Sequence, residues 1–216
     1  MRNLKISILA LTGLLSLPAA YASSIQGVMW SVPASTADNV PTLGHVPGTG
    51  ATELGTFTAS EIKFSGDSNY SLGGFLNSFG AASNIVFMNG ATANSSLTDV
   101  LFEFTGSASF TNGQTFNVLH DDGVNLYVSS NLVLGQPNTT SPITTPFTYT
   151  GSSGVFDFDF IYANGPPTQA DFQTTLVTSG TITSSNAPEP SSLLLWGVGL
   201  LALAVVTIRR RQLQVN

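Results

Sequence analysis

The segment 116–128 contains the side chains of this chain that are best suited to chemistry. It reads FNVLHDDGVNLYV, so two alternating stretches flank His120, the adjacent carboxylates Asp121 and Asp122, and Gly123. An isolated Asp-Gly pair between strands is typical of a hairpin turn, because both residues tolerate positive φ at little cost. The paired carboxylates also make this segment the main candidate for a functional site. Both interpretations depend on the elements around it.

The sequence offers little for catalysis. His45 and His120 are the only imidazoles, and neither has a second histidine at a metal-ligand spacing. The chain has no Gly-x-Ser-x-Gly motif and no phosphate-binding glycine loop. Asp157 and Asp159 form a second carboxylate pair, and paired carboxylates can hydrolyse glycosides. They lie about 7 Å apart on one strand face, where solvated surface charge is the ordinary explanation.

The elements that must position these residues are predicted to be strands. Residues 155–162 alternate strictly, which places Phe158 and its apolar neighbours on one face and Asp157 and Asp159 on the other. Similar patterns at 53–64, 100–104, 114–120, 125–129 and 147–151 are separated by turn residues. No segment has convincing helical periodicity, and the Pro-rich stretch 137–146 is expected to be a surface loop. We predict an all-β domain over residues 23–178, an antiparallel sandwich with jelly-roll-like topology.

Between its two ends the chain is strongly acidic. Eleven of the twelve Asp and Glu residues lie there, and Lys63 is the only one of the six Lys and Arg residues, so the net charge is −10. Nucleic acid is excluded as a partner, because phosphate backbones are bound by clusters of Lys and Arg. Calcium, neutral glycans and protein partners remain open. The chain has no Cys, so stability must come from the core without disulfides.

The N-terminus has the pattern of a secretory signal. Arg2 and Lys5 precede an uncharged, mostly apolar run at 6–17, and Ala20 and Ala22 have the small side chains that a signal peptidase reads. We predict a signal peptide over residues 1–22 and export of the chain.

The C-terminus has the pattern of a membrane segment. Residues 193–208 contain no charge, two serines extend this run to residue 191, and Arg209, Arg210 and Arg211 follow. A helix of this length just crosses a bilayer core at 1.5 Å per residue. An exported chain reaches the arginines last, so they act as a cytoplasmic stop-transfer signal. We predict a polar stalk at 179–186 and a transmembrane helix at 191–208.

The residues before this helix are Pro188, Glu189 and Pro190. Two prolines disfavour helix and keep the tripeptide extended, as an enzyme substrate requires. Tripeptide, apolar helix and basic cluster, in this order over residues 187–216, resemble the PEP-CTERM sorting signal. The resemblance implies cleavage by an exosortase, a membrane-embedded cysteine transpeptidase-like enzyme of Gram-negative bacteria that make exopolysaccharide. The protein is then expected in the inner membrane before processing, and afterwards at the cell surface or in the biofilm matrix.

The segment 116–128 has a resemblance of its own. A strand ending in His-Asp-Asp-Gly-Val, followed by Leu-Tyr-Val, is similar to the Asp-Asp-Gly segment of the protective-antigen-type β-sandwich, the family of yeast flocculins and GLEYA adhesins. In the calcium-dependent lectins of that family, adjacent aspartates joined by a cis peptide bond ligate the ion, and the ion holds sugar hydroxyls. The resemblance, over roughly residues 97–175, implies that Asp121 and Asp122 are calcium ligands.

Two carboxylates are too few for calcium, which takes six to eight oxygens. Backbone carbonyls, water and a further Asn or Asp must complete the site, and the candidates are Asn131, Asn164, Asp157 and Asp159. Many relatives continue the second strand into Asp-Gly, whereas this chain has residues 127–131, Tyr-Val-Ser-Ser-Asn. The sequence therefore predicts a non-catalytic surface or matrix protein that binds glycans with calcium. A secreted carbohydrate-active hydrolase is the alternative.

Overall fold

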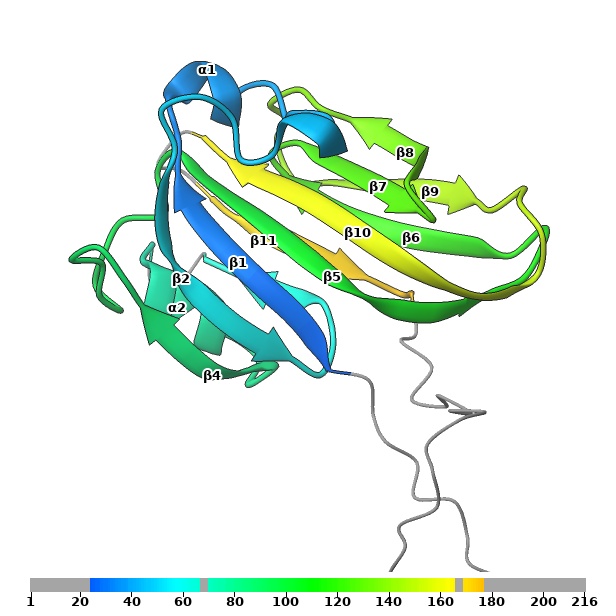
Figure 1. Cartoon of the computed structure of the whole chain (residues 1–216), viewed down its shortest axis with the longest axis horizontal. Coiled ribbons are helices and arrows are strands. Elements are labelled where there is room, and N and C mark those ends of the chain that lie inside the picture. Colours follow the sequence, from blue (N-terminus) through cyan, green and yellow to red (C-terminus); the bar gives the residue numbers. More distant parts are fainter. Residues whose placement is uncertain (1–23, 67–69, 166–168, 177–216) are drawn as a thin grey trace, which may run out of the picture. The chain divides into compact units, whose positions relative to one another are not determined.

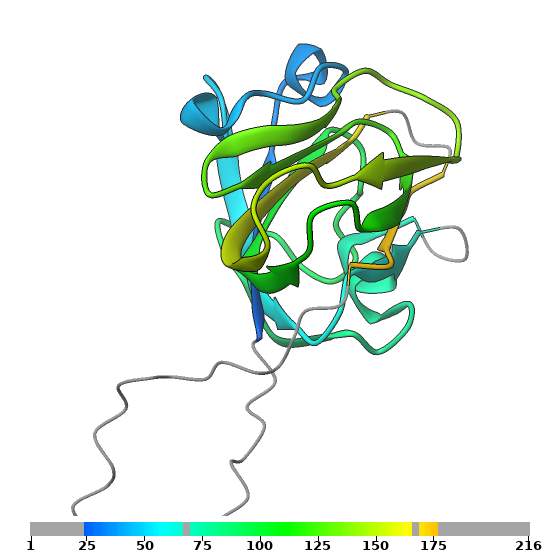
Figure 2. The same cartoon turned by 90° about the vertical axis from the view of Figure 1, so that its right-hand side faces the viewer.

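The computed structural model describes residues 24–66, 70–165 and 169–176. The chain divides into two units, Met1–Ile182 and Thr183–Asn216, and all of these residues belong to the first. They form two antiparallel β-sheets packed face to face (Figures 1 and 2). The predicted antiparallel β-sandwich is therefore confirmed. The signal peptide, the stalk and the sorting segment predicted at 1–22, 179–186 and 187–216 lie outside the described residues.

The larger sheet has seven strands in the order β4-β2-β1-β5-β10-β7-β8, and every neighbouring pair is antiparallel. Its centre is the long pair β5 and β10, which are in register over eleven residues from Val100↔Asn164 to Phe110↔Gly154. The seven strands are β1 (Ile25–Ser31), β2 (Thr52–Ala59), β4 (Ala82–Phe87), β5 (Val100–Phe110), β7 (Val124–Val128), β8 (Asn131–Gln136) and β10 (Gly154–Asn164).

The smaller sheet has four antiparallel strands in the order β3-β11-β6-β9. These are β3 (Lys63–Ser65), β6 (Thr115–Asp121), β9 (Ile143–Thr148) and β11 (Asp171–Thr174). The predicted strand at 53–64 is in fact two strands, β2 and β3, which belong to different sheets. The Pro-rich stretch was expected to be a loop, but β9 begins inside it and includes Pro146. As an edge strand, β9 can contain a proline.

Aromatic side chains from both sheets fill the space between them. Tyr162 of β10 stacks on Phe172 of β11 with ring centroids 4.7 Å apart, and Phe104 of β5 lies 5.1 Å from the same ring. Such pairs stabilise beyond the area that they bury. The alternation predicted for β10 is confirmed, since Phe158 is 2% exposed while Asp157 is exposed.

One short helix completes this core. Helix α2 (Leu72–Asn77) begins at Ser71, whose hydroxyl accepts a hydrogen bond from the Gly74 N–H at 3.1 Å, and it buries Phe75. This capping pattern is favoured at helix starts. The sequence analysis predicted no helix, and that was wrong because six residues are too few to show a 3.6-residue period.

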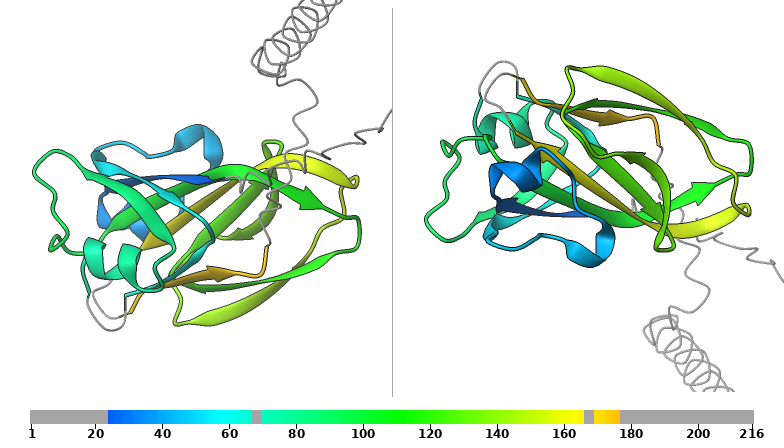
Figure 3. Two further views of the ribbon diagram at one scale, coloured as in Figure 1. Left: turned by 90° about the horizontal axis from the view of Figure 1, so that it is seen from below. Right: turned by 90° about the horizontal axis from the view of Figure 1, so that it is seen from above.

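Another segment covers the face of the larger sheet that points away from the core. Residues 32–51, here called the cover segment, contain α1 (Ala34–Ala37) and the 3₁₀ turn η1 (Leu43–His45), and they lie over the outer face near β1 and β10 (Figure 3). Apolar side chains pack between the segment and the sheet: Val32, Ala37 and Val40 against Leu101, Tyr127, Ile161 and Ala163. This part of the outer face is therefore shielded from solvent, although it points away from the core.

The alternation of β10 generates a paired test. Phe158→Ala should lower the free energy of unfolding by about 3–5 kcal/mol, because it empties a buried aromatic site. Asp157→Ala, one residue away on the exposed face, should change it by less than about 1 kcal/mol. Urea denaturation of the purified protein measures both. Equal effects would contradict the assignment of the two faces.

Candidate functional site

The paired carboxylates lie where the chain crosses from one sheet to the other. Strand β6 ends at Asp121 in the smaller sheet, and β7 starts at Val124 in the larger one. The two strands do not pair with each other, so the hairpin-turn interpretation of Asp122-Gly123 is wrong. A Cβ at Gly123 would lie 2.6 Å from the carbonyl oxygen of Pro137. Glycine is required at this crossing for close packing.

Both aspartates are nearly enclosed, at 4% exposure each, and the peptide bond between them is cis, as the resemblance implied. The Asp122 carboxylate accepts the Gly165 N–H on Oδ2 at 2.8 Å and the Thr140 N–H on Oδ1 at 3.2 Å. The Asp121 carbonyl accepts a hydrogen bond from the Tyr162 hydroxyl. The two backbone N–H groups hold the Asp122 carboxylate in a fixed orientation.

His120 supports this arrangement from the preceding position. Its Nδ1–H donates to the Asp122 carbonyl at 2.6 Å, and its Nε2 lies 3.0 Å from the Thr145 hydroxyl. Burial lowers the pKa of His120, against the opposing effects of this hydrogen bond and of the Asp122 charge. A neutral imidazole with one donor and one acceptor satisfies both contacts. His120 therefore orients the crossing between the sheets.

A hollow of about 510 Å³ opens beside the two carboxylates. It is also lined by Gln169 and by four residues of the loop between β8 and β9: Thr139, Thr140, Ser141 and Pro142. The low-complexity stretch thus contributes hydroxyl groups to the candidate site. Carboxylate, hydroxyl and amide oxygens are hard donors of the type that calcium prefers.

Asn164 is the one proposed additional ligand that lies near the pair. It is fully buried at the end of β10, next to Gly165, and its Oδ1 atom has no hydrogen-bond partner. Its Nδ2 donates to the Leu97 carbonyl at 2.9 Å and to the Tyr70 hydroxyl. A buried amide oxygen without a partner is costly and calls for an explanation, such as an absent ion or water.

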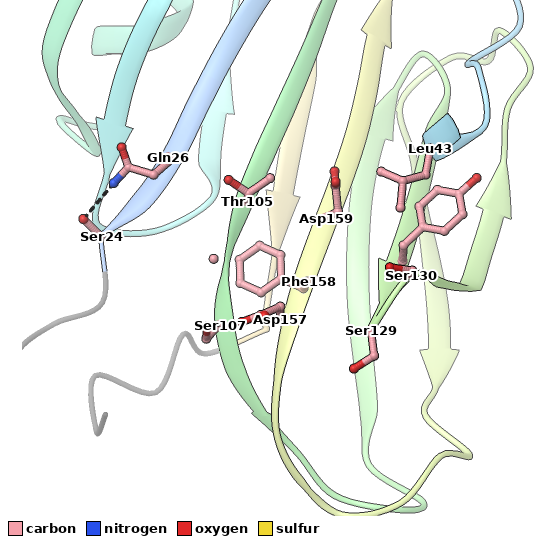
Figure 4. Close-up of a pocket in the computed structure, with 12 residues that line it drawn as sticks. Ser24, Gln26, Leu43, Thr105, Ser107, Ser129, Ser130, Asp157, Phe158 and Asp159 are labelled. Atoms are coloured by element: carbon pink, nitrogen blue, oxygen red, sulfur yellow. Dashed lines mark hydrogen bonds between the residues drawn. The ribbon is translucent and has the colours of Figure 1, made fainter. Parts of the chain in front are cut away.

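The other three candidates lie elsewhere. Asn131 begins β8 and donates to the Ser129 carbonyl at 3.0 Å. Asp157 and Asp159 line a different hollow, a groove of about 430 Å³ on the outer face of the larger sheet (Figure 4). There Asp157 accepts a hydrogen bond from the Ser107 hydroxyl at 2.6 Å. These residues cannot complete a site at Asp121 and Asp122.

The sequence analysis missed three residues around the pair. A Cβ at Gly165 would lie 3.1 Å from Oδ1 of Asp38 and 3.4 Å from Oδ2 of Asp122, which places the two carboxylates close together. Burial raises the pKa values of Tyr70 and Tyr162, and the charges of Asp121 and Asp122 raise them further. Asp38 and Tyr70 lie far away in sequence, so no local pattern could have indicated them.

Among the described residues no group of three or more His, Cys, Asp or Glu side chains could hold a metal ion. A calcium site here would therefore need amide, backbone or water oxygens. The same residues include no helix with the length and apolar character of a membrane span. The helix predicted at 191–208 lies outside them.

The solved structures similar to this chain include two PA14 domains and a β-glucosidase. The PA14 sugar-binding domain from an RTX adhesin is 20% identical, with a TM-score of 0.46, over 70% of this chain and 86% of that one. The PA14 domain of the MpAFP antifreeze protein is 22% identical, with a TM-score of 0.46, over 74% and 84%. A β-glucosidase from Kluyveromyces marxianus is 10% identical, with a TM-score of 0.40, over 71% of this chain and 16% of the enzyme. Likenesses this weak carry no inference about ligand or activity.

Sequence comparison identifies the motif at the C-terminal end of the chain. No curated protein matches the chain. A family model described as the PEP-CTERM protein-sorting motif matches residues 186–211, the segment that contains Pro188, Glu189, Pro190 and the three arginines. Such a motif indicates export, processing by an exosortase and sorting to the cell surface. The chain is thus an exported β-sandwich protein that carries the PEP-CTERM protein-sorting motif.

Proposed function

We propose that this protein is a non-catalytic glycan-binding domain of the cell surface or biofilm matrix, and that its binding depends on calcium. The observation that supports the proposal most directly is the buried Oδ1 of Asn164, which lacks a partner one residue from Gly165, the donor to Asp122. That oxygen and the two carboxylates would coordinate a bound calcium ion.

The available donors suit calcium in kind. Asp121 and Asp122 would supply the charge and Asn164 a neutral oxygen, while backbone carbonyls of the 139–142 loop and water would complete six to eight ligands. Both Asp122 oxygens already accept an N–H, and each keeps a further lone pair for an ion. Bound calcium would supply a positive centre at which sugar hydroxyls can replace water.

The hollow also suits a glycan by its shape and polarity. Its hydroxyl-rich wall can hydrogen-bond a polyol, and no Lys or Arg from the described residues lines it. A neutral sugar held through a cation is therefore a better match than a phosphate or other anion, which would meet two carboxylates directly. Exopolysaccharide has this chemistry, and it is the glycan that surrounds an exported matrix protein.

A carbohydrate-active hydrolase remains the alternative reading. Glycosidases need two carboxyl groups that face each other across the scissile bond, about 5–10 Å apart. Asp121 and Asp122 are adjacent in the chain, and both carboxylate oxygens of Asp122 already accept backbone N–H groups. We therefore propose binding without cleavage. Release of reducing sugar from a bound polysaccharide would contradict this point.

Calcium should stabilise the protein by mass action. We expect the thermal midpoint to rise on calcium addition, with half-saturation at roughly 10⁻⁴ to 10⁻³ M, as in extracellular modules. Asp121→Asn combined with Asp122→Asn should abolish the rise, because it removes both anionic ligands. Differential scanning fluorimetry of the full-length chain, with magnesium as the ion control, measures the effect.

Asp157→Asn is the matched control, since it removes one carboxylate from the other hollow and should leave the calcium response unchanged. A glycan array with calcium and with chelator then tests ligand binding. If millimolar calcium does not stabilise the wild-type protein, the ion is not part of its function. A calcium response without any calcium-dependent glycan binding would leave the ion structural and contradict the lectin role.

The sorting motif generates a separate prediction. Deleting Pro188, Glu189 and Pro190 should leave a precursor retained in the inner membrane, because the apolar segment and Arg209–Arg211 still stop transfer. Ser191→Ala with Ser192→Ala, which spares the tripeptide, is the control and should be processed normally. Mass spectrometry of membrane and surface fractions identifies the products. Peptides from residues 193–209 on surface protein from wild-type cells would refute the cleavage.

A further inference from the structure

Two acidic side chains meet on the outer face of the larger sheet, away from Asp121 and Asp122. Asp159 of β10 is opposite Thr105, and Glu103 of β5 is opposite Ile161. Glu103 and Asp159 are therefore diagonal neighbours on the two central strands, at the distance where long side chains touch. Both are half-buried. The expectation that Asp159 is solvated surface charge is wrong.

The pair lies at the margin of the cover segment. Leu101 and Ile161, the outward residues on one side, are packed beneath that segment, whereas Asp157 on the other side is exposed. Leu43 of η1 lines the groove together with Asp159. Any charge on the pair is thus held against an apolar boundary, where water can solvate it only from one side.

The contact between the two side chains requires a proton. As diagonal neighbours, the carboxyl groups of Glu103 and Asp159 can hydrogen-bond to each other, and Oδ1 of Asp159 is buried with no other hydrogen-bond partner among the described residues. Two ionised carboxylates are acceptors only, so such a bond forms when one of them is protonated.

No Lys or Arg among the described residues lies near enough to offset this acidity. Lys63 is the only Lys or Arg in the described part of the chain, and it lies on β3 of the other sheet, against the Phe79 ring. The titratable groups on the elements packed around the pair are Asp157 of β10, Tyr127 of β7 and His45 of η1. β1 presents Gln26 and Val28, which carry no charge.

We propose that Glu103 and Asp159 share one proton and act as a pH-sensitive clamp between β5 and β10. The protonated pair joins the two central strands beside the cover segment, and loss of the proton leaves two like charges at that boundary. The clamp makes the folded protein more stable in mildly acidic than in alkaline medium. It is independent of calcium and of any glycan.

The direction follows from the proton affinities. Burial, then the Glu103 charge and the hydrogen bond to it, raise the pKa of Asp159 from 3.8 to about 7, and burial also raises the pKa of Glu103. Between these two pH values the folded protein keeps a proton that the unfolded chain has lost. The free energy of unfolding therefore falls as the pH rises from about 4 to about 7, and the loss is complete above that range.

The test compares thermal midpoints at about pH 5 and about pH 8 for the full-length chain in detergent, with chelator present so that calcium cannot contribute. Wild type should melt higher at the lower pH, and Asp159→Asn should reduce this difference by about 2–5 °C, because the titrating group is gone. Asp157→Asn, on the same strand face, is the matched control and should keep the wild-type difference.

A direct titration covers the case in which Asp159→Asn does not fold. In the wild-type protein, carboxyl ¹³C shifts followed by NMR should show Asp159 titrating near neutral pH, with a coupled response at Glu103. Glu103→Gln should move the Asp159 transition to lower pH by removing the charge. An Asp159 transition near 4, or an Asp159→Asn variant with the full wild-type pH dependence, would overturn the proposal.

Discussion

The crossing of the backbone at Asp122 and Gly123 is the constraint on which the candidate site depends. Strands β6 and β7 follow each other in sequence but belong to different sheets, so the chain must pass from one layer to the other within two residues. The Pro137 carbonyl and the Val40 side chain come so close to Gly123 that any side chain there would collide. That packing holds Asp122 between Thr140 and Gly165, and it brings residues from three distant segments to one hollow.

Alternation along single strands allowed much of this fold to be predicted. Phe158 and Asp157 were assigned to opposite faces correctly, because a two-residue period is a local property of the chain. The placement of β6 and β7 in different sheets was not local information, and the same Asp-Gly pair fits a hairpin and a crossing equally well. Asn164 was only one of four candidates for an additional calcium ligand. Its Nδ2 is oriented by Leu97 and Tyr70, which are distant in sequence, and this leaves Oδ1 without a partner.

The two acidic sites show how surroundings decide the state of a carboxyl group. Asp122 meets two backbone N–H groups, which hold its carboxylate oxygens as hydrogen-bond acceptors. Asp159 meets another carboxyl group and an apolar boundary, which stabilise a proton instead. In the sequence, the two residues are simply aspartates within or directly after an alternating stretch. Their difference comes from the strands and loops that the fold places opposite them.

The position of Lys63 has a practical consequence. It is the only lysine between residues 23 and 178, it lies on β3 at the edge of the smaller sheet, and it lines neither the hollow at Asp122 nor the groove at Asp159. A reagent that acylates primary amines will therefore modify one side chain of this domain, outside the residues that line either hollow. Fluorophores or surface linkers coupled to side-chain amines would then attach to this domain through β3.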